Sequence, residues 1–306
     1  MTRAEFEAAV GPISTREEFL EELRTAIDEG TGYATGKLGN SEQSWLRYPE
    51  VLSREPPGTR RRAFEVVLAY KSLPTTGIFP AEPEFLRRWS SYYVERVKRL
   101  DAVGLVQDSY KEYYETFKFH GISGPRFVIQ QDQQPDRSSP HDESRCYLPL
   151  FRSRDVLLIC PFAGVLAERA NKETFEAVWA KTGKPWFHPR SVEALENPYG
   201  FSRETQALYP TALDLLADLA GQIDERDFDV ALIAAGGLGI PLASIIREQD
   251  RVAISLGGHL QIVFGVLGGR WRSNERWQRR YFNEAWIDMP ERYVPDYAET
   301  VIDDYW

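Results

Sequence analysis

Residues 227–270 carry the pattern that most constrains the fold. From Phe228 the chain reads FDVALIAAGGLGIPLASIIREQDRVAISLGG, which is a short apolar run, a glycine turn, a helical segment and a second apolar run. About thirty residues is the size of one strand–helix–strand unit. Because parallel strands joined in this way cross over with a right hand, residues 227–270 predict one Rossmann-like, glycine-rich half.

The rest of the chain extends this pattern. The apolar run DVLLICPF at 155–162 is typical of a strand buried on both faces, and we expect a helix from there to about Ala180 and another over about 203–224. Residues 16–29 and 82–100 predict amphipathic helices. The polar stretch 121–149 predicts a loop or lid. The fold class is therefore α/β, with a doubly wound, mainly parallel Rossmann-like sheet and an irregular polar insertion, in one domain over 1–306.

Composition excludes several classes of protein. Hydrophobic residues make up 42% of the 306 residues and charged residues 27%, as in a globular protein with a substantial core. The net charge of −9 argues against broad binding to nucleic acid or anionic lipid. No apolar run is long enough to span a membrane, and Cys146 and Cys160 have no metal or disulfide spacing. We expect a cytoplasmic protein.

The first candidate site is the glycine turn AAGGLGIPLA, where Gly236, Gly237 and Gly239 follow a predicted strand and precede a helix. Glycines at such a turn let a ligand approach the backbone, and the helix N-terminus offers N–H groups to phosphate. The spacing is not GxGxxG, and no acidic residue ends the next strand, so a dinucleotide fingerprint is absent. The alternative is a tight turn that binds nothing.

The second candidate lies at the end of the next strand, where Gly257, Gly258, His259 and Gln261 follow VAIS. Ligands of open α/β sheets bind at this edge. His259 is suited to contact a diphosphate or to act as a base, although a structural histidine is the alternative. Arg270, a little further on, is suited to clamp a phosphate.

A third group is Lys37, Gly39, Asn40 and Glu42 in GKLGNSEQ, at a predicted strand end. Glu42 has the chemistry to bind a divalent cation or a sugar hydroxyl, and Lys37 to face a phosphate. The alternative is that Asn40 or Ser41 caps a helix that starts at Glu42.

Residues 271–286 interleave arginines with aromatic residues. Such a strip resembles a stacking surface for single-stranded nucleic acid. The acidity of the chain favours the other interpretation, in which the aromatic side chains pack and the arginines form surface ion pairs.

Several segments together resemble a known family. KLGNSEQ, LLICPFAGVLAER, ALIAAGGLGIPLASIIRE, AISLGGHLQIVFGVLGGRW and the terminal YW, in this order, are similar to the GT-D fold glycosyltransferases, formerly a domain of unknown function found in bacterial polysaccharide and adhesin glycosylation. The resemblance implies that the three turn glycines, the 257–259 segment, Pro161 and Phe162 surround a nucleotide sugar. It also implies a Mn²⁺ or Mg²⁺ site at Glu42 and Asn40. Asn40 replaces the family's aspartate, which weakens that site.

The expected function is transfer of a hexose from a nucleoside diphosphate sugar to a glycan or protein acceptor. Glu42 or His259 would act as base, and the glycine-turn N–H groups, Lys37 and Arg270 would stabilise the departing diphosphate. Two other classes stay open: a non-catalytic Rossmann-like module that binds a nucleotide or a partner protein, and a single-stranded nucleic-acid binder. A redox or methyl-transfer enzyme fits the glycine spacing less well.

Overall fold

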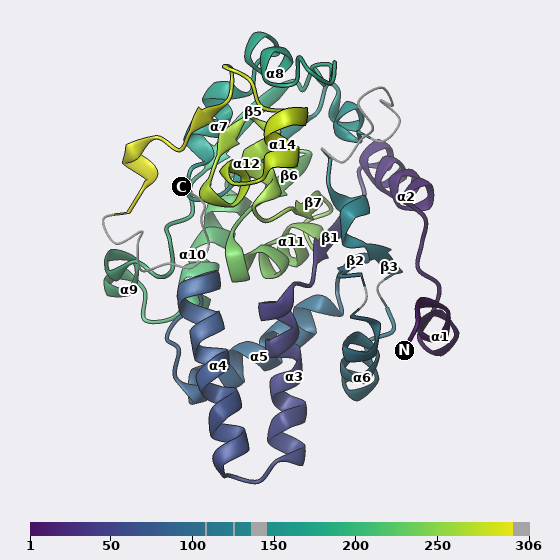
Figure 1. Ribbon diagram of the computed structural model, residues 1–306, viewed down its shortest axis with the longest axis vertical. Helices are drawn as coiled ribbons and strands as arrows, with labels where there is room; N and C mark the ends of the chain where they lie inside the picture. Colours follow the sequence, from purple (N-terminus) through teal and green to yellow (C-terminus); the bar gives the residue numbers. More distant parts are fainter. Residues whose placement is uncertain (108, 125, 136–145, 296–306) are drawn as a thin grey trace.

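The computed structural model describes residues 1–107, 109–124, 126–135 and 146–295. Seven strands form one sheet in the order β3-β2-β1-β7-β6-β4-β5, and every neighbouring pair is parallel (Figure 1). The strands are β1 (Tyr33–Lys37), β2 (Ala102–Leu105), β3 (Arg126–Ile129), β4 (Asp155–Ile159), β5 (Ser191–Leu195), β6 (Val230–Ile233) and β7 (Val252–Ser255). The predicted α/β class and parallel sheet are confirmed.

Helices cover both faces of this sheet (Figure 1). In β4, Leu157 and Ile159 enter one core, whereas Val156 and Leu158 enter the other, as alternation along a strand requires. The first core also takes side chains from α1 (Arg3–Ala9), α3 (Asn40–Arg54), α4 (Thr59–Thr76), α5 (Pro83–Val97), α6 (Tyr110–His120), α10 (Ala212–Asp224) and α11 (Gly239–Arg247). The second takes them from α2 (Arg16–Glu29), α7 (Ala163–Arg169), α8 (Lys172–Val178) and α12 (His259–Val263).

The predicted helices agree with the structure where the sequence carries clear end signals. Helix α2 spans the predicted 16–29, and a capping box of Thr15 and Glu18 fixes its start. Helix α5 lies within the predicted 82–100 and buries Phe85, Trp89 and Tyr93 on one face, as an amphipathic helix does. The strand–helix–strand unit of 227–270 is present as β6, α11 and β7.

Two predicted helices are each divided into two. The helix expected after β4 breaks into α7 and α8, because Asn171 starts a new helix by accepting a hydrogen bond from the Thr174 N–H. The helix expected over 203–224 is α9 (Arg203–Leu208) followed by α10. Pro210 has no N–H to continue the first helix, and Thr211 caps the second.

The polar stretch 121–149 differs from the predicted loop or lid. Its described part contains β3, a 3₁₀ turn at Gln130–Gln133 and another at Leu148–Phe151. The Gln133 amide is buried and donates to the Thr35 hydroxyl, and the Tyr147 hydroxyl donates to the Gln133 carbonyl. β3 is the last strand in the sheet order, so this part forms an edge of the sheet, and the Gln133 amide enters the fold there. Residues 136–145 lie outside the described residues, as do Tyr305 and Trp306.

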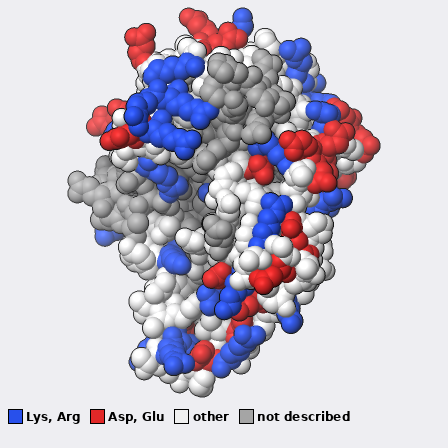
Figure 2. Space-filling model, turned by 45° about the vertical axis from the view of Figure 1, so that its right-hand side comes forward, with Lys and Arg blue, Asp and Glu red and all other residues white. Residues whose placement is uncertain are grey.

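A small second sheet pairs β8 (Val266–Leu267) with β9 (Ile287–Asp288) and carries α13 (Gly269–Arg272) and α14 (Glu275–Arg280) between them. Four aromatic side chains of this segment are buried, at 7–8% exposure, and Phe282 is half-buried: the four are Trp271, Trp277, Tyr281 and Trp286. Figure 2 shows basic side chains gathered at the upper left of one face, but rings that are packed inside cannot stack on bases. The structure supports the packing interpretation for these aromatic side chains, and of the arginines Arg272 forms an ion pair with Asp288.

Cys146 and Cys160 are buried free thiols. In the described ranges, no helix combines the length and the apolarity that crossing a bilayer would require.

Candidate functional site

The carboxyl ends of four neighbouring strands form the candidate site. Ile159 of β4 pairs with Ile233 of β6, Ile233 with Ser255 of β7, and Ser255 with Gly36 of β1. These strands therefore end at one rim of the sheet, and the segments that follow them are neighbours. Open α/β sheets bind ligands at this rim.

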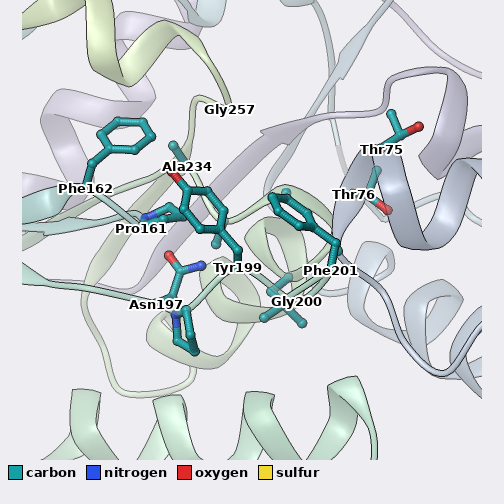
Figure 3. Close-up of a pocket in the computed structure, with 15 residues that line it drawn as sticks. Thr75, Thr76, Pro161, Phe162, Asn197, Tyr199, Gly200, Phe201, Ala234 and Gly257 are labelled. Atoms are coloured by element: carbon teal, nitrogen blue, oxygen red, sulfur yellow. The ribbon is translucent and has the colours of Figure 1, made fainter. Parts of the chain in front are cut away.

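A cavity lies at this rim, with about 580 Å³ of space when its open mouth is included (Figure 3). It is bounded by the segments after β4, β5, β6 and β7 and by the carboxyl end of α4. Of the sequence-predicted residues, Pro161, Phe162, Gly236 and Gly257 line it. The other lining residues are Thr75, Thr76, Gly77, Asn197, Pro198, Tyr199, Gly200, Phe201, Ala234, Ala235 and Leu238.

Gly236 and Gly257 have the backbone conformation that favours glycine. Their φ angles are +51° and +56°, in the left-handed region. At Gly236 a Cβ would also stand 2.5 Å from the carbonyl oxygen of Thr76. The absence of a side chain thus lets the turn after β6 touch the end of α4, which closes one side of the cavity.

Gly237 and Gly239 have a different role from the one the sequence predicts. A Cβ on Gly237 would stand 2.5 Å from the Ile78 side chain, and one on Gly239 would stand 2.5 Å from the Ser255 hydroxyl. Both glycines make room for protein atoms, and neither is among the described residues that line the cavity. A 3₁₀ turn at Gly236–Leu238 also stands between β6 and α11, so the helix N-terminus does not directly follow the strand.

Asn197 is the polar side chain of the cavity whose bonding is incomplete. It is 4% exposed, and its Oδ1 accepts no hydrogen bond from any residue that the structure describes. In Figure 3 its amide group points toward the same space as the Tyr199 ring. A buried carbonyl without a partner costs about 1–3 kcal/mol, and this one belongs to a side chain that lines the cavity.

Two aromatic rings form the wall nearest Asn197. Tyr199 and Phe201 stack on each other, with ring centroids 5.0 Å apart and planes at 25° (Figure 3). The Tyr199 hydroxyl donates to the Tyr293 carbonyl at 3.1 Å, and the Tyr293 hydroxyl donates to Glu196 at 2.6 Å. These bonds tie the segment after β5 to the C-terminal region, so that the aromatic wall is held in place.

Lys37 brings a cation to the cavity edge. It ends β1 and is half-buried. A Cβ on Gly257 would stand 3.3 Å from its Cε and 3.7 Å from its Nζ, so the lysine side chain extends across to the tip of β7. The sequence placed Lys37 and Gly257 at separate strand ends, and the sheet order makes them neighbours.

Glu42 lies at the other side of the β1 tip. Helix α3 begins at Asn40 with Gly39 as N-cap and without a side-chain cap, so neither Asn40 nor Ser41 caps a helix starting at Glu42. A Cβ on Gly39 would stand 2.8 Å from Glu42 Oε2. Burial, with a smaller contribution from the Glu42 charge, raises the pKa of Tyr113 to about 12. The Glu42 carboxylate thus lies beside Gly39 at the first turn of α3. It is not among the cavity's described lining residues.

The remaining predicted residues lie apart from the cavity. His259 is 6% exposed, and its ring packs against Trp271 with centroids 4.9 Å apart. Gln261 is fully buried and donates to the Val266 carbonyl at 3.3 Å. Gly258 is the N-cap of the buried helix α12, and Arg270 is exposed on α13. The short helix α12 turns His259 and Gln261 into the second core, which the glycine pattern alone could not show.

The sequence analysis missed the segment after β5 and the end of α4. Asn197, Tyr199 and Phe201 belong to the run NPYGF, in which an Asn-Pro pair and a glycine follow an apolar strand. That composition marks a loop with aromatic residues and could have been noticed. Thr75 and Thr76 carry no such signal, because only the tertiary fold brings α4 to the rim.

Comparison with known proteins gives structural likeness only. No family model matches the sequence, and no curated protein matches it. Among solved structures, the chain is similar to a new glycosyltransferase (DUF1792) from Streptococcus sanguinis, with a TM-score of 0.44, 10% identity, and coverage of 95% of this chain and 98% of that one. It is also similar to a selenomethionine-substituted DUF1792 domain, with a TM-score of 0.41, 11% identity, and coverage of 94% and 99%.

Proposed function

We propose that this chain transfers a hexose from a nucleoside diphosphate sugar to a hydroxyl of a glycan or protein acceptor, with the rim cavity as the donor site. One observation carries the proposal: the segments after β4, β6 and β7 meet in one cavity, with the Lys37 side chain against Gly257. The backbone of the glycine turns and the Lys37 ammonium group are suited to bind a diphosphate. The aromatic and apolar walls of the cavity are suited to bind a nucleotide base or a sugar ring.

The chemistry assigns a task to each group. The acceptor oxygen attacks the anomeric carbon while the bond from that carbon to the diphosphate oxygen breaks, and the electron pair leaves with the diphosphate. Lys37 is placed to stabilise that developing charge. His259 is enclosed by Trp271 and Trp277, so Glu42 is the group proposed to accept the proton of the acceptor hydroxyl. Because Glu42 is not among the cavity's described lining residues, this role requires the acceptor hydroxyl to lie beside Glu42, outside the donor cavity.

The residues present fit a protein-built metal site poorly. In the described ranges, no group of three or more His, Cys, Asp and Glu side chains is arranged to hold an ion. Glu42 with the neutral amide of Asn40 would supply at most two ligands, so Mn²⁺ or Mg²⁺ would take its remaining ligands from the donor diphosphate and water. No step above requires the metal.

The second candidate is a non-catalytic nucleotide-binding module. It is favoured by the cavity lining, which includes no Asp, Glu or His among the described residues. Such a module would bind the nucleotide in the same place without breaking the sugar bond.

A thermal-shift screen of UDP, GDP, CMP and ADP sugars, each with and without Mn²⁺, tests the donor site. A site ligand at a hundred times its dissociation constant stabilises the fold by about 2.7 kcal/mol. Release of free nucleotide in the presence of glycan acceptors separates the transferase from the module that only binds. No shift with any member of the panel would overturn both candidates.

A further inference from the structure

Helices α3 and α4 form a hairpin that projects from the body of the molecule (Figure 1). Apolar side chains are exposed on the outer face of α4. Val66, Val67 and Tyr70 are 68%, 51% and 59% exposed, and Ala63 is exposed beside them. The spacing 63, 66, 67, 70 places these side chains in one stripe along a helix. Scattered exposed apolar residues are ordinary, but a stripe of them on one helix marks an interaction surface.

The inner face of α4 is fully used, so the stripe is not a packing face turned outward. Leu68 and Ser72 are buried, and the Ser72 hydroxyl accepts a hydrogen bond from the Trp45 indole N–H at 2.8 Å. This bond joins α4 to α3 and fixes the rotation of α4. Because packing against α3 fixes the rotation of α4, Val66, Val67 and Tyr70 are held on the solvent-facing side of the hairpin.

The charges of α4 are also sorted between its faces. Its one acidic residue, Glu65, faces inward, where it accepts hydrogen bonds from the Tyr48 hydroxyl and the Arg61 guanidinium. Arg60 and Arg62 are exposed on the two flanks of the apolar stripe. The outer face is thus apolar and cationic.

The apolar and cationic side chains together indicate what kind of partner binds the outer face of α4. A second copy of the chain would bring like charges together across the stripe, and one stripe of this length is small beside the roughly 1,200–2,000 Å² that stable interfaces bury. An anionic bilayer accepts apolar side chains and tyrosine at its boundary and attracts arginine to its headgroups. The net charge of −9 repels the rest of the molecule from such a surface, so contact would be confined to the hairpin.

We propose that the outer face of α4 docks the protein on an anionic lipid bilayer. The same helix ends at Thr76, which lines the rim cavity. Docking through the stripe therefore sets the cavity mouth at a fixed place relative to the lipid surface. This surface is independent of the donor chemistry proposed above.

Flotation of the full-length protein with vesicles tests the proposal. We expect the protein to float with vesicles of phosphatidylcholine mixed with phosphatidylglycerol, and far less with phosphatidylcholine alone. Arg60→Gln with Arg62→Gln should weaken partitioning about thirty-fold, from about 1 kcal/mol for each basic residue at the surface. Val66→Ser, Val67→Ser and Tyr70→Ser together should abolish flotation.

Matched controls are available elsewhere on the surface. Leu208→Ser changes another exposed apolar residue, at 75% exposure, and Arg276→Gln with Arg279→Gln changes two exposed arginines of α14. Both controls should float like the parent protein, and every variant should keep its melting temperature. Equal flotation of the hairpin variants, or none by the parent, overturns the proposal. So does a concentration-dependent dimer in light scattering that the Val66, Val67 and Tyr70 changes dissolve, because a second copy would then cover the stripe.

Discussion

The backbone of Gly77 touches that of Gly200: a Cβ built on Gly200 would overlap the Gly77 carbonyl oxygen and carbon. Gly77 ends α4 in the left-handed conformation, and Gly200 lies in the segment after β5. This contact joins two walls of the cavity that come from distant parts of the chain.

Gly200→Ala should therefore separate the two walls. We expect a loss of about 1–3 kcal/mol in the free energy of unfolding, as for overpacked positions, and loss of the thermal shift produced by a nucleotide sugar. Gly221→Ala is the matched control, since a Cβ there meets no atom within 4 Å and lies inside α10. That variant should be more stable by about 0.5–1 kcal/mol and should bind as before. Unchanged binding by Gly200→Ala would mean that the cavity is not the donor site.

Asn197→Leu should separate stability from binding. Because Oδ1 of Asn197 is buried and accepts nothing from the described residues, replacing the amide by an apolar group of similar size should leave the melting temperature unchanged or higher. Ligand affinity should fall at least about tenfold. Asn283→Leu is the contrast: its amide donates to the Ala177 and Val178 carbonyls, so that variant should lose stability and keep its affinity. A destabilised Asn197→Leu protein with normal affinity would contradict the assignment.

Lys37→Gln should weaken binding of charged ligands alone. A hydrogen bond to a charged group contributes about 1.5–3 kcal/mol, so affinity for a nucleoside diphosphate should fall about ten- to hundredfold. Affinity for the uncharged nucleoside should stay the same, because the lysine lies at the edge beside Gly257. Isothermal titration with both ligands measures the difference. Lys111→Gln, on an exposed face of α6, serves as control. Equal losses for both ligands would show that Lys37 shapes the cavity rather than meeting a phosphate.

His120 should make the fold sensitive to mild acid. Burial lowers the pKa of His120 from its ordinary 6.5, and its Nε2 lies 2.5 Å from the Leu46 carbonyl oxygen, to which the neutral ring donates. A lowered pKa in the folded state means that the unfolded chain binds more protons below 6.5. The stabilising contribution is therefore full above pH 6.5 and is lost as the pH falls through the folded pKa.

His120→Gln keeps a donor for Leu46 and removes the titration. Urea unfolding at pH 7.5 and pH 5.5 should show a smaller loss of stability in this variant than in the parent. His188→Asn, at an exposed histidine, should leave the parent's pH dependence unchanged. An identical loss in parent and His120→Gln would exclude this residue as the source.

Much of the fold could be predicted from the sequence where a strand is a short, continuous apolar run. The runs at β4 and β6 are examples, and their side chains enter both cores. Helix breaks at Asn171 and Pro210 were missed, since apolar periodicity continued across them while local capping and the lost N–H decided the ends. Strand β3 was missed because its neighbours in sequence are polar, and tertiary partners such as Thr35 satisfy them.

The candidate cavity lies at the rim that the sequence predicts, but its lining only partly matches the predicted residues. The strand-end rim follows from the parallel order, and it brings Lys37, Gly236 and Gly257 to one place. Gly237 shows the limit: a glycine that faces a ligand and one that faces Ile78 look alike in sequence. Asn197 could not be singled out either, since its missing partner is a property of the assembled fold.

Helix α4 belongs to two surfaces at once, because its outer stripe meets the surroundings while Thr76 and Gly77 form a wall of the cavity. If contact with a lipid surface favours one position of α4, that contact also favours one position of the cavity wall formed by Thr76 and Gly77. Thermodynamic linkage makes such an effect mutual. If lipid binding at the hairpin raises the affinity of the cavity for its ligand, then ligand binding must raise the affinity for lipid by the same factor. The fraction of the protein on a lipid surface would then depend on the ligand concentration.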